Sequence, residues 1–279
     1  MQDSNAHLHS ESALNEAIRN FGIEVISNLP YDPNPDQMSL IAQFGNFCFA
    51  SPSDSVFLLG GYAGTGKTSI TGAIVKTLTD HNVKCVLLAP TGRAAKVFTD
   101  YSHHAAFTIH RKIYRQKAYG TEGFGIAENK HTNTFFIVDE ASMISNSTAE
   151  GSFFGTGQLL DDLIHYVYSG NNCRLVLIGD RAQLPPVGQS DSPALSRSVL
   201  EAYGLNVYEC FLTDIARQAA QSGILFNATI LRNMMAENNL TKPVLAFSQF
   251  SDIEPISREF LLEKISDCYS IDGLPETIV

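Results

Sequence analysis

The chain has 279 residues, and its hydrophobic content of 44% excludes a globally disordered protein. Its net charge of −10 argues against a protein that coats nucleic acid by bulk positive charge, but not against a local basic groove. The five cysteines form no C-x-x-C pair, so neither a zinc site nor a disulfide framework is indicated. The sequence shows neither a signal peptide nor a membrane-length apolar segment, which predicts a cytoplasmic protein without a membrane partner.

The predicted elements alternate between helices and buried strands. Residues 1–29 form a helical segment with apolar residues at helical spacing, and a turn cluster, YDPNP, separates it from a helix that starts at Asp36. An apolar run at residues 56–60 predicts a buried strand, and a helix follows from Thr68. Because helical stretches separate the later strands, we expect an α/β fold with a parallel sheet covered by helices. These later apolar runs are residues 84–89, 134–138 and 174–178.

A phosphate-binding motif lies between the first strand and its helix. Residues 61–68, GYAGTGKT, fit the pattern G-x-x-x-x-G-K-[ST] of a P-loop. Its glycines allow backbone N–H groups to turn toward phosphates, and Lys67 is expected to reach the β- and γ-phosphates while Thr68 binds Mg²⁺. The alternative is a glycine-rich turn with a chance lysine, which the flanking strand and helix disfavour. The expected nucleotide-binding residues here are Gly61, Gly64, Thr65, Gly66, Lys67, Thr68 and Ser69.

Two carboxylates follow the apolar run of residues 134–138. In P-loop NTPases a first carboxylate at such a position helps to hold Mg²⁺, and a neighbouring glutamate can activate the attacking water. We therefore expect Asp139 to be a metal ligand and Glu140 to be the general base. A solvated strand terminus is the alternative, and the preceding P-loop makes it the weaker one.

The run at residues 174–178 leads into the segment GDRAQLPPVG at residues 179–188. A strand that ends in Gly-Asp fits the sheet edge at which ligands bind in doubly wound folds. The uncharged Gln183 could hydrogen-bond a γ-phosphate or its water and so sense the nucleotide state. A proline-rich surface turn is the alternative on pattern alone.

Positive charge is concentrated between residues 91 and 117, where six basic residues and one acid give a net charge of +5 and leave −15 for the rest of the chain. We interpret this stretch as a local phosphate-binding surface, although charge runs are often only solvated faces. The nearby histidines lack metal-ligand spacing. The glycine-rich stretch of residues 114–133 predicts an inserted hairpin or loop. The six basic residues are Arg93, Lys96, Arg111, Lys112, Arg115 and Lys117.

The P-loop, the segment IVDEAS and the segment GDRAQLPPVG, in this order, closely resemble superfamily 1 helicases of the RecD/Dda-like branch. The resemblance covers about residues 36–232 and implies a RecA-like motor domain that uses ATP and Mg²⁺ and binds single-stranded DNA. Residues 35–37, PDQ, look like the Q motif, in which Gln37 would read the adenine. Residues 212–218 look like motif IV, whose arginine, Arg217, would approach the γ-phosphate. Taken alone, Gln37 would be a surface glutamine and Arg217 a solvated helix charge.

Two more segments resemble motifs that line the track of single-stranded DNA in relatives. Residues 89–95, APTGRAA, resemble motif Ia, and residues 107–110, FTIH, resemble motif Ib. Phe98, one helical turn after Ala94, is either a core aromatic or a stacking surface for a base. The inserted hairpin stands where relatives carry a small domain that helps to part the duplex. The residues expected to bind DNA are Pro90, Thr91, Arg93, Phe98, Thr108 and His110.

The resemblance also predicts the domain organisation. We expect an N-terminal helical segment at residues 1–29, a RecA-like ATPase domain at residues 30–204 and the start of a truncated second motor domain at residues 205–279. Motifs V and VI of the family are not found, so we expect the chain alone to bind ATP·Mg²⁺, to hydrolyse it poorly and not to unwind DNA. In the intact protein, its partner would be the missing motor domain.

Two other functions stay open on the sequence alone. The first is a small-molecule kinase or another P-loop NTPase that acts without nucleic acid. Phosphorylation of a small acceptor would support it. The segment GDRAQLPP and the basic stretch argue against it. A non-catalytic nucleotide-binding module would keep its function after Lys67→Ala.

Overall fold

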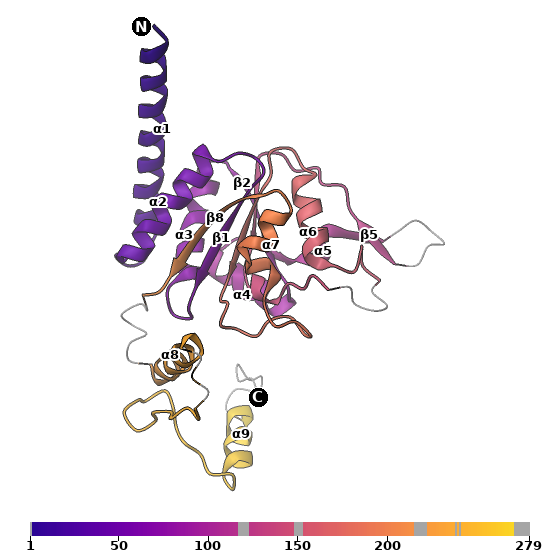
Figure 1. Cartoon of the computed structure of the whole chain (residues 1–279). Helices are drawn as coiled ribbons and strands as arrows, with labels where there is room; N and C mark the ends of the chain where they lie inside the picture. Colours follow the sequence, from indigo (N-terminus) through magenta and orange to yellow (C-terminus); the bar gives the residue numbers. More distant parts are fainter. Residues whose placement is uncertain are drawn as a thin grey trace. The chain divides into compact units, whose positions relative to one another are not determined.

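The computed structural model of the chain describes residues 2–116, 123–147, 153–214, 222–237, 239 and 241–270, without the side chains of residues 2–10, 236 and 268–270. The chain divides into two compact units, residues 1–215 and residues 216–279. The first unit contains a six-stranded sheet with helices on both faces (Figure 1).

All six strands of the main sheet are parallel, in the order β3-β2-β6-β7-β1-β8. Their carboxyl ends therefore meet at one edge, where ligands bind in folds of this kind. The predicted α/β class with a parallel sheet is confirmed. The strands are β1 (Ser55–Gly61), β2 (Lys84–Ala89), β3 (Ala106–Thr108), β6 (Thr134–Val138), β7 (Arg174–Gly179) and β8 (Asn206–Leu212).

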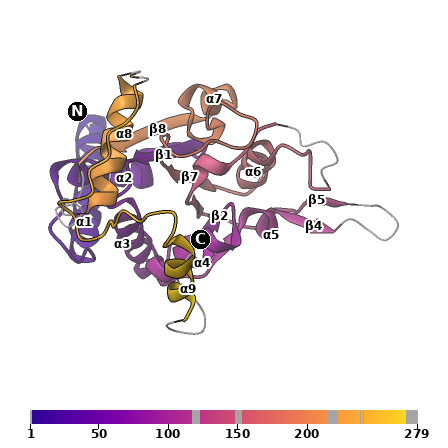
Figure 2. The same cartoon turned by 90° about the horizontal axis from the view of Figure 1, so that it is seen from below.

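Successive side chains of each strand point to opposite faces, which produces two hydrophobic cores. Phe57 and Leu59 pack in one core, whereas Val56 and Leu58 pack in the other. Figure 2 shows the helices on the two sides of the sheet. The first core holds side chains of α1 (Gln2–Ser27), α2 (Pro35–Ala50), α3 (Lys67–Asp80) and α4 (Gly92–Ser102). The second holds side chains of α5 (Ile109–Ile113), α6 (Leu159–Tyr168), α7 (Arg197–Ala202) and the short 3₁₀ helices η1 (Ala141–Met143) and η2 (Pro193–Leu195).

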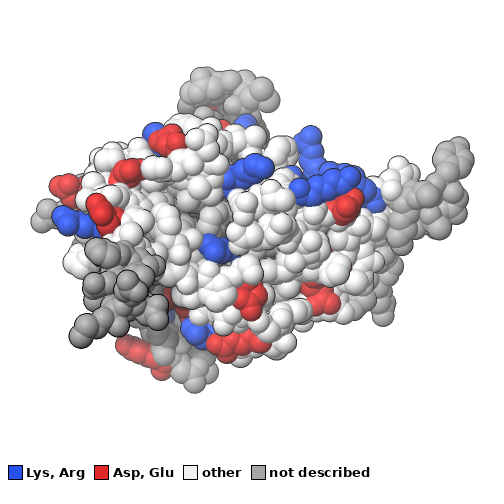
Figure 3. Space-filling view, turned by 90° about the horizontal axis from the view of Figure 1, so that it is seen from above, with Lys and Arg blue, Asp and Glu red and all other residues white. Residues whose placement is uncertain are grey.

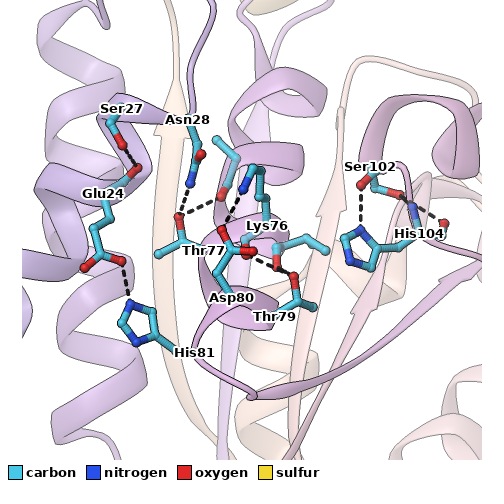
Figure 4. A network of polar contacts seen from close by, with 12 residues as sticks. Glu24, Ser27, Asn28, Lys76, Thr77, Thr79, Asp80, His81, Ser102 and His104 are labelled. Carbon is cyan, nitrogen blue, oxygen red and sulfur yellow. Dashed lines mark hydrogen bonds and ion pairs between the residues drawn. The ribbon is translucent and has the colours of Figure 1, made fainter.

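The N-terminal helix α1 is tied to the end of α3 by polar contacts, which Figure 4 shows at close range. Glu24 Oε2 lies 2.5 Å from His81 Nε2, and the Asn28 amide donates a 3.0 Å hydrogen bond to Thr77 Oγ1. The predicted helical segment at the N-terminus is therefore present, and it supports the helix that follows the P-loop.

The predicted insertion is a two-stranded antiparallel hairpin of β4 (Tyr114–Gln116) and β5 (Phe124–Ile126), separate from the main sheet. Its first strand is anchored to α6, because the Tyr114 hydroxyl donates a 2.5 Å hydrogen bond to Asp162 Oδ2. The hairpin prediction is confirmed within the described part of this segment.

The boundary predicted between residues 204 and 205 is corrected by the structure. Strand β8 pairs with β1 along its whole length, so residues 206–212 belong to the first unit, and the division falls after residue 215. An apolar strand that completes a sheet cannot be distinguished from one that starts a new domain by its sequence alone. The second unit contains α8 (Gly223–Ala236) and α9 (Leu261–Ser270). Among the described residues, no helix combines the length and the apolar character needed to span a bilayer.

Candidate nucleotide-binding site

The P-loop joins the carboxyl end of β1 to the first residue of α3. Gly64 and Gly66 have φ angles of 80° and 85°, in the left-handed region that favours glycine. A Cβ atom on Gly66 would also lie 2.6 Å from Gln37 Nε2. The glycines are therefore required both by the backbone turn and by the close approach of a neighbouring side chain.

Lys67 begins α3, and its ammonium group is directed back over the loop. Its Nζ donates hydrogen bonds of 2.7 Å to the Gly61 carbonyl and 2.9 Å to the Tyr62 carbonyl. Thr68 and Ser69 follow in the first turn of the helix, where backbone N–H groups have no partner within the helix. The turn thus brings together a cation, two hydroxyls and oriented N–H groups, which is the donor set that phosphates require.

The two carboxylates predicted for metal and water lie at the same edge of the sheet. Asp139 and Glu140 directly follow β6, and β7 separates that strand from β1. The Asp139 N–H donates to the Leu88 carbonyl at 3.0 Å, and the Glu140 N–H donates to Asp139 Oδ1 at 2.8 Å. Glu140 has a φ of 54°, an uncommon conformation for a residue other than glycine.

Burial raises the pKa of Asp139, while the Glu140 N–H and the charge of Lys67 act in the opposite direction. Burial also raises the pKa of Glu140, and the negative charges of Asp139 and Asp180 add to the effect, which Lys67 again opposes. The charge of Lys67 thus reaches both carboxylates, so the P-loop and the end of β6 face a common site.

Asp180, at the end of β7, is a member of this cluster that the sequence analysis did not select. It is 1% exposed, and its Oδ1 accepts a 2.9 Å hydrogen bond from the Ala182 N–H. The loop it supports carries Gln183, whose Oε1 accepts a 3.3 Å hydrogen bond from the Ser142 hydroxyl, just after Glu140. The only sequence signal for Asp180 was its place after Gly179 at a strand end.

Gln37 is 2% exposed, so the interpretation as a surface glutamine is wrong. Its Nε2 donates to the Thr65 carbonyl at 2.9 Å, and its Oε1 accepts from the Asn34 N–H at 3.1 Å. Asn34 Oδ1 in turn accepts from the Gln37 N–H at 2.9 Å, which completes a capping box at the start of α2. In this structure the Gln37 amide holds the P-loop, and its recognition of adenine stays a prediction.

The end of β8 is bonded to the same region. The Tyr62 N–H donates to the Leu212 carbonyl at 3.3 Å. Asp36 Oδ2 accepts hydrogen bonds from the Thr213 hydroxyl at 2.7 Å and from the Thr213 N–H at 3.0 Å, and these bonds lower the pKa of Asp36. Arg217, the predicted γ-phosphate sensor, lies outside the described residues.

Two predicted DNA-binding threonines cap helices that leave the same sheet edge. Thr91 Oγ1 accepts from the Ala94 N–H at 3.2 Å at the start of α4, and Thr108 Oγ1 accepts from the Arg111 N–H at 3.3 Å at the start of α5. Because these helices follow β2 and β3, motifs Ia and Ib lie side by side beyond the carboxylates. Pro90 precedes Thr91 at this edge.

The other predicted DNA-binding residues differ in accessibility. Arg93 is exposed in the first turn of α4. The ring of His110 lies 5.6 Å from that of Tyr114 and 5.1 Å from that of Phe154, and burial lowers its pKa. Phe98 is 1% exposed within the core, so it offers no face to a base and the stacking prediction is wrong. Phe98 lies on the face of α4 that packs in the core, so its role is structural.

The residues at this edge fit a nucleotide with a magnesium ion. The Thr68 hydroxyl and the Asp139 carboxylate are hard oxygen ligands, and Mg²⁺ is commonly held by one or two such groups together with phosphates and waters. The described residues contain no group of three His, Cys, Asp or Glu side chains that could hold a metal by themselves.

Comparison with known proteins identifies a family and two relatives of this chain. Residues 34–240 match the AAA domain family AAA_30. The ATP-dependent RecD2 DNA helicase of Deinococcus radiodurans is 32% identical over 174 residues, which cover 61% of this chain and 20% of the relative. An uncharacterized protein of Acanthamoeba polyphaga mimivirus is 29% identical over 161 residues, which cover 49% of this chain and 30% of that protein. The chain thus spans less than a third of the length of these two relatives.

Two solved helicase structures are similar to this chain. One is Pif1 helicase from Bacteroides in complex with ADP-AlF3 and ssDNA, at 18% identity and a TM-score of 0.45, covering 89% of this chain and 58% of that one. The other is Pif1 helicase from Candida albicans, at 19% identity and a TM-score of 0.40, covering 73% of this chain and 44% of that one. The family match covers most of the chain, which therefore belongs to the AAA domain family AAA_30.

Proposed function

We propose that this chain is an ATP-dependent DNA motor domain that binds ATP·Mg²⁺ and single-stranded DNA. The observation that carries the proposal is the convergence of Lys67 with Asp139 and Glu140 at one edge of the sheet, where the lysine charge acts on both carboxylates. The name of the Deinococcus relative, an ATP-dependent DNA helicase, supports the same function. The cytoplasm is the compartment in which we expect it to act.

Nucleotide binding would use the P-loop and the first turn of α3. Backbone N–H groups would donate to the phosphates, and Lys67 would exchange its carbonyl partners for phosphate oxygens, which are stronger acceptors because they are charged. Thr68 and Asp139 would hold Mg²⁺, which when bound neutralises charge that develops on the phosphates. Gln37 would read the adenine from the side of the loop that it already supports.

Hydrolysis would use Glu140 as the general base. Its pKa is raised by burial and by two neighbouring acids, which increases the basicity of the carboxylate toward a water proton. Gln183 hydrogen-bonds Ser142 close to this carboxylate, and its amide would sense the γ-phosphate. Arg217 would approach the same phosphate from the other motor domain.

Single-stranded DNA would cross the edge formed by motifs Ia and Ib. Thr91 and Thr108 lie there at the starts of adjacent helices, and Arg93 adds an exposed charge. Pro90 and His110 complete the expected DNA contacts. We also propose that residues 216–279 are the start of a second motor domain, whose closure on the nucleotide would move the strand.

Lys67→Ala tests the proposal. We expect the affinity for a fluorescent ATP analogue with Mg²⁺ to fall by about 100-fold, because a charge-assisted contact to phosphate is lost at a preorganised site. ATPase rates, measured with and without single-stranded DNA, should fall to background. Lys76→Ala is the matched control, since Lys76 lies on the same helix but forms an exposed ion pair with Asp80. Nucleotide binding by Lys67→Ala at the level of the control would refute the proposal.

A further inference from the structure

The basic stretch of residues 91–117 is divided by the fold into two surfaces, apart from Lys117, which lies outside the described residues. Arg93 lies in α4 just after the carboxyl end of β2, at the nucleotide edge. Lys112 lies near the carboxyl end of α5. Burial lowers the pKa of His131, and the positive charges of Lys112 and Lys84 lower it further, so these two lysines lie near His131. Lys84 is the first residue of β2, so this second group of charges gathers where the strands begin.

The second surface, which we call the amino-edge patch, comprises Lys84, Lys112, Arg115, Lys130 and His131. Figure 3 looks down on the side where the strands begin and shows Lys and Arg side chains gathered toward the hairpin, with few acidic residues among them. Glu128 is one acid here, and it forms a 3.3 Å ion pair with Lys130 in which both side chains are largely exposed. Such an exposed pair is weak and can be exchanged for another anion.

The patch is held by rigid elements. Lys84 pairs in register with Thr134, which places the segment before β6 beside it. The His131 carbonyl accepts a 3.2 Å hydrogen bond from the Asn171 N–H, which fixes that segment. Arg115 Nη1 donates to the Arg111 carbonyl at 2.9 Å and to the Tyr114 carbonyl at 2.7 Å, so its guanidinium is fixed at the base of the hairpin.

We propose that the amino-edge patch binds the phosphate backbone of duplex DNA, separately from the single-strand track at the nucleotide edge. This inference rests on the proposed function and adds a second DNA contact to it. The patch lies beside β4 of the hairpin, and four of its five members are Lys or Arg. Sites for single strands stack bases on aromatic rings, whereas contacts made by Lys and Arg alone suit a continuous backbone.

Anisotropy titrations of the 279-residue chain with two labelled probes test the inference. One probe is a single strand of about eight nucleotides, within the usual size of a single-strand site. The other extends that strand into a duplex. In the double variant Lys84→Gln/Lys130→Gln, affinity for the tailed duplex should fall about 10-fold at 0.1 M salt. The slope of log affinity against log salt should decrease by about 2, one for each phosphate contact. Affinity for the short strand should stay within about twofold.

The matched control is Lys242→Gln/Lys264→Gln, which removes the same charge from exposed positions of the second unit. An unchanged salt slope on the tailed duplex would overturn the inference, as would an equal loss on both probes or in the control. Failure of the unaltered chain to bind the short strand would refute the proposed function instead, because that probe does not reach the patch.

Discussion

At the scale of single residues, the site places negative charges close together at the edge of the sheet. Asp139 is half-buried beside Glu140, and the buried Asp180 adds a third charge nearby. Desolvation and like-charge repulsion both oppose ionisation, and the charge of Lys67 compensates part of the effect. The free protein is therefore less stable at neutral pH than it would be with one of these carboxylates replaced by an amide.

Asp139→Asn should stabilise the free chain. The pKa of Asp139 is raised in the folded state, so its contribution to stability is greatest below the pKa of the unfolded chain and is lost as pH rises through the folded pKa. We expect a gain of about 1 kcal/mol at pH 7, or ~3 °C in Tm, and a smaller gain near pH 4. The oxygen of the new amide would still accept from the Glu140 N–H, but Mg²⁺-dependent nucleotide binding should be lost.

Thermal unfolding at both pH values measures this effect, with Asp100→Asn on the surface of α4 as the control. A lower Tm than that of the unaltered chain at pH 7 would contradict the argument. It would mean that attraction to Lys67 outweighs desolvation.

At the scale of elements, one buried carboxylate positions the hairpin. Asp162 on α6 is 1% exposed and accepts hydrogen bonds from the Tyr114 hydroxyl, from the Thr156 N–H at 3.0 Å and from the Thr156 hydroxyl at 2.9 Å. It thus joins the start of β4 to the segment before α6. The same Tyr114 ring contacts His110, which connects the hairpin to motif Ib.

Tyr114→Phe should remove one of these bonds without changing the shape of the core. Since the acceptor is charged and buried, we expect a loss of about 2 kcal/mol in the free energy of unfolding. Tyr101→Phe, at an exposed position of α4, should change it by less than about 0.5 kcal/mol. Denaturant unfolding measures both values, and equal effects of the two substitutions would show that the Asp162 contact does not anchor the hairpin.

At the scale of the whole first unit, Arg174 connects a helical layer to the sheet. From the start of β7, its guanidinium donates to the carbonyls of Phe47 at 3.2 Å, Cys48 at 2.7 Å and Ser51 at 2.9 Å. These carbonyls lie at the end of α2, where they have no partner within the helix and the helix dipole favours a cation. The same guanidinium lies 5.7 Å from the centroid of the Phe135 ring.

Arg174→Met should keep most of the packing and lose all three hydrogen bonds. We expect the free energy of unfolding to fall by about 3 kcal/mol, because the carbonyls of Cys48 and Ser51 lose a charged donor, whereas the Phe47 carbonyl still accepts from the Ser51 hydroxyl. The denaturant midpoint should fall while the m-value stays constant. Arg93→Met, on the exposed start of α4, is the control and should leave the midpoint nearly unchanged. A similar midpoint for both variants would contradict the role given to Arg174.

Much of the fold could be predicted because its signals are local. Apolar runs of five or six residues marked the central strands, and the run of residues 134–138 together with the preceding P-loop predicted that Asp139 and Glu140 lie at the sheet edge. Phe98 and Gln37 show the limit. For each, the choice between interpretations depended on burial, and burial depends on which distant segment packs against the residue. Asp180 was missed for the same reason, since its environment is made by three separate strand ends.

The sequence by itself determined the P-loop and the α/β alternation, because positive φ angles at glycine and the period of apolar residues are properties of short segments. Only the tertiary structure decided that β8 completes the first sheet and that the basic stretch is split between its two edges. The order of the strands in the sheet and the path of the chain between them decide where β8 and the basic residues lie. Both arise from packing between residues that are far apart in the sequence.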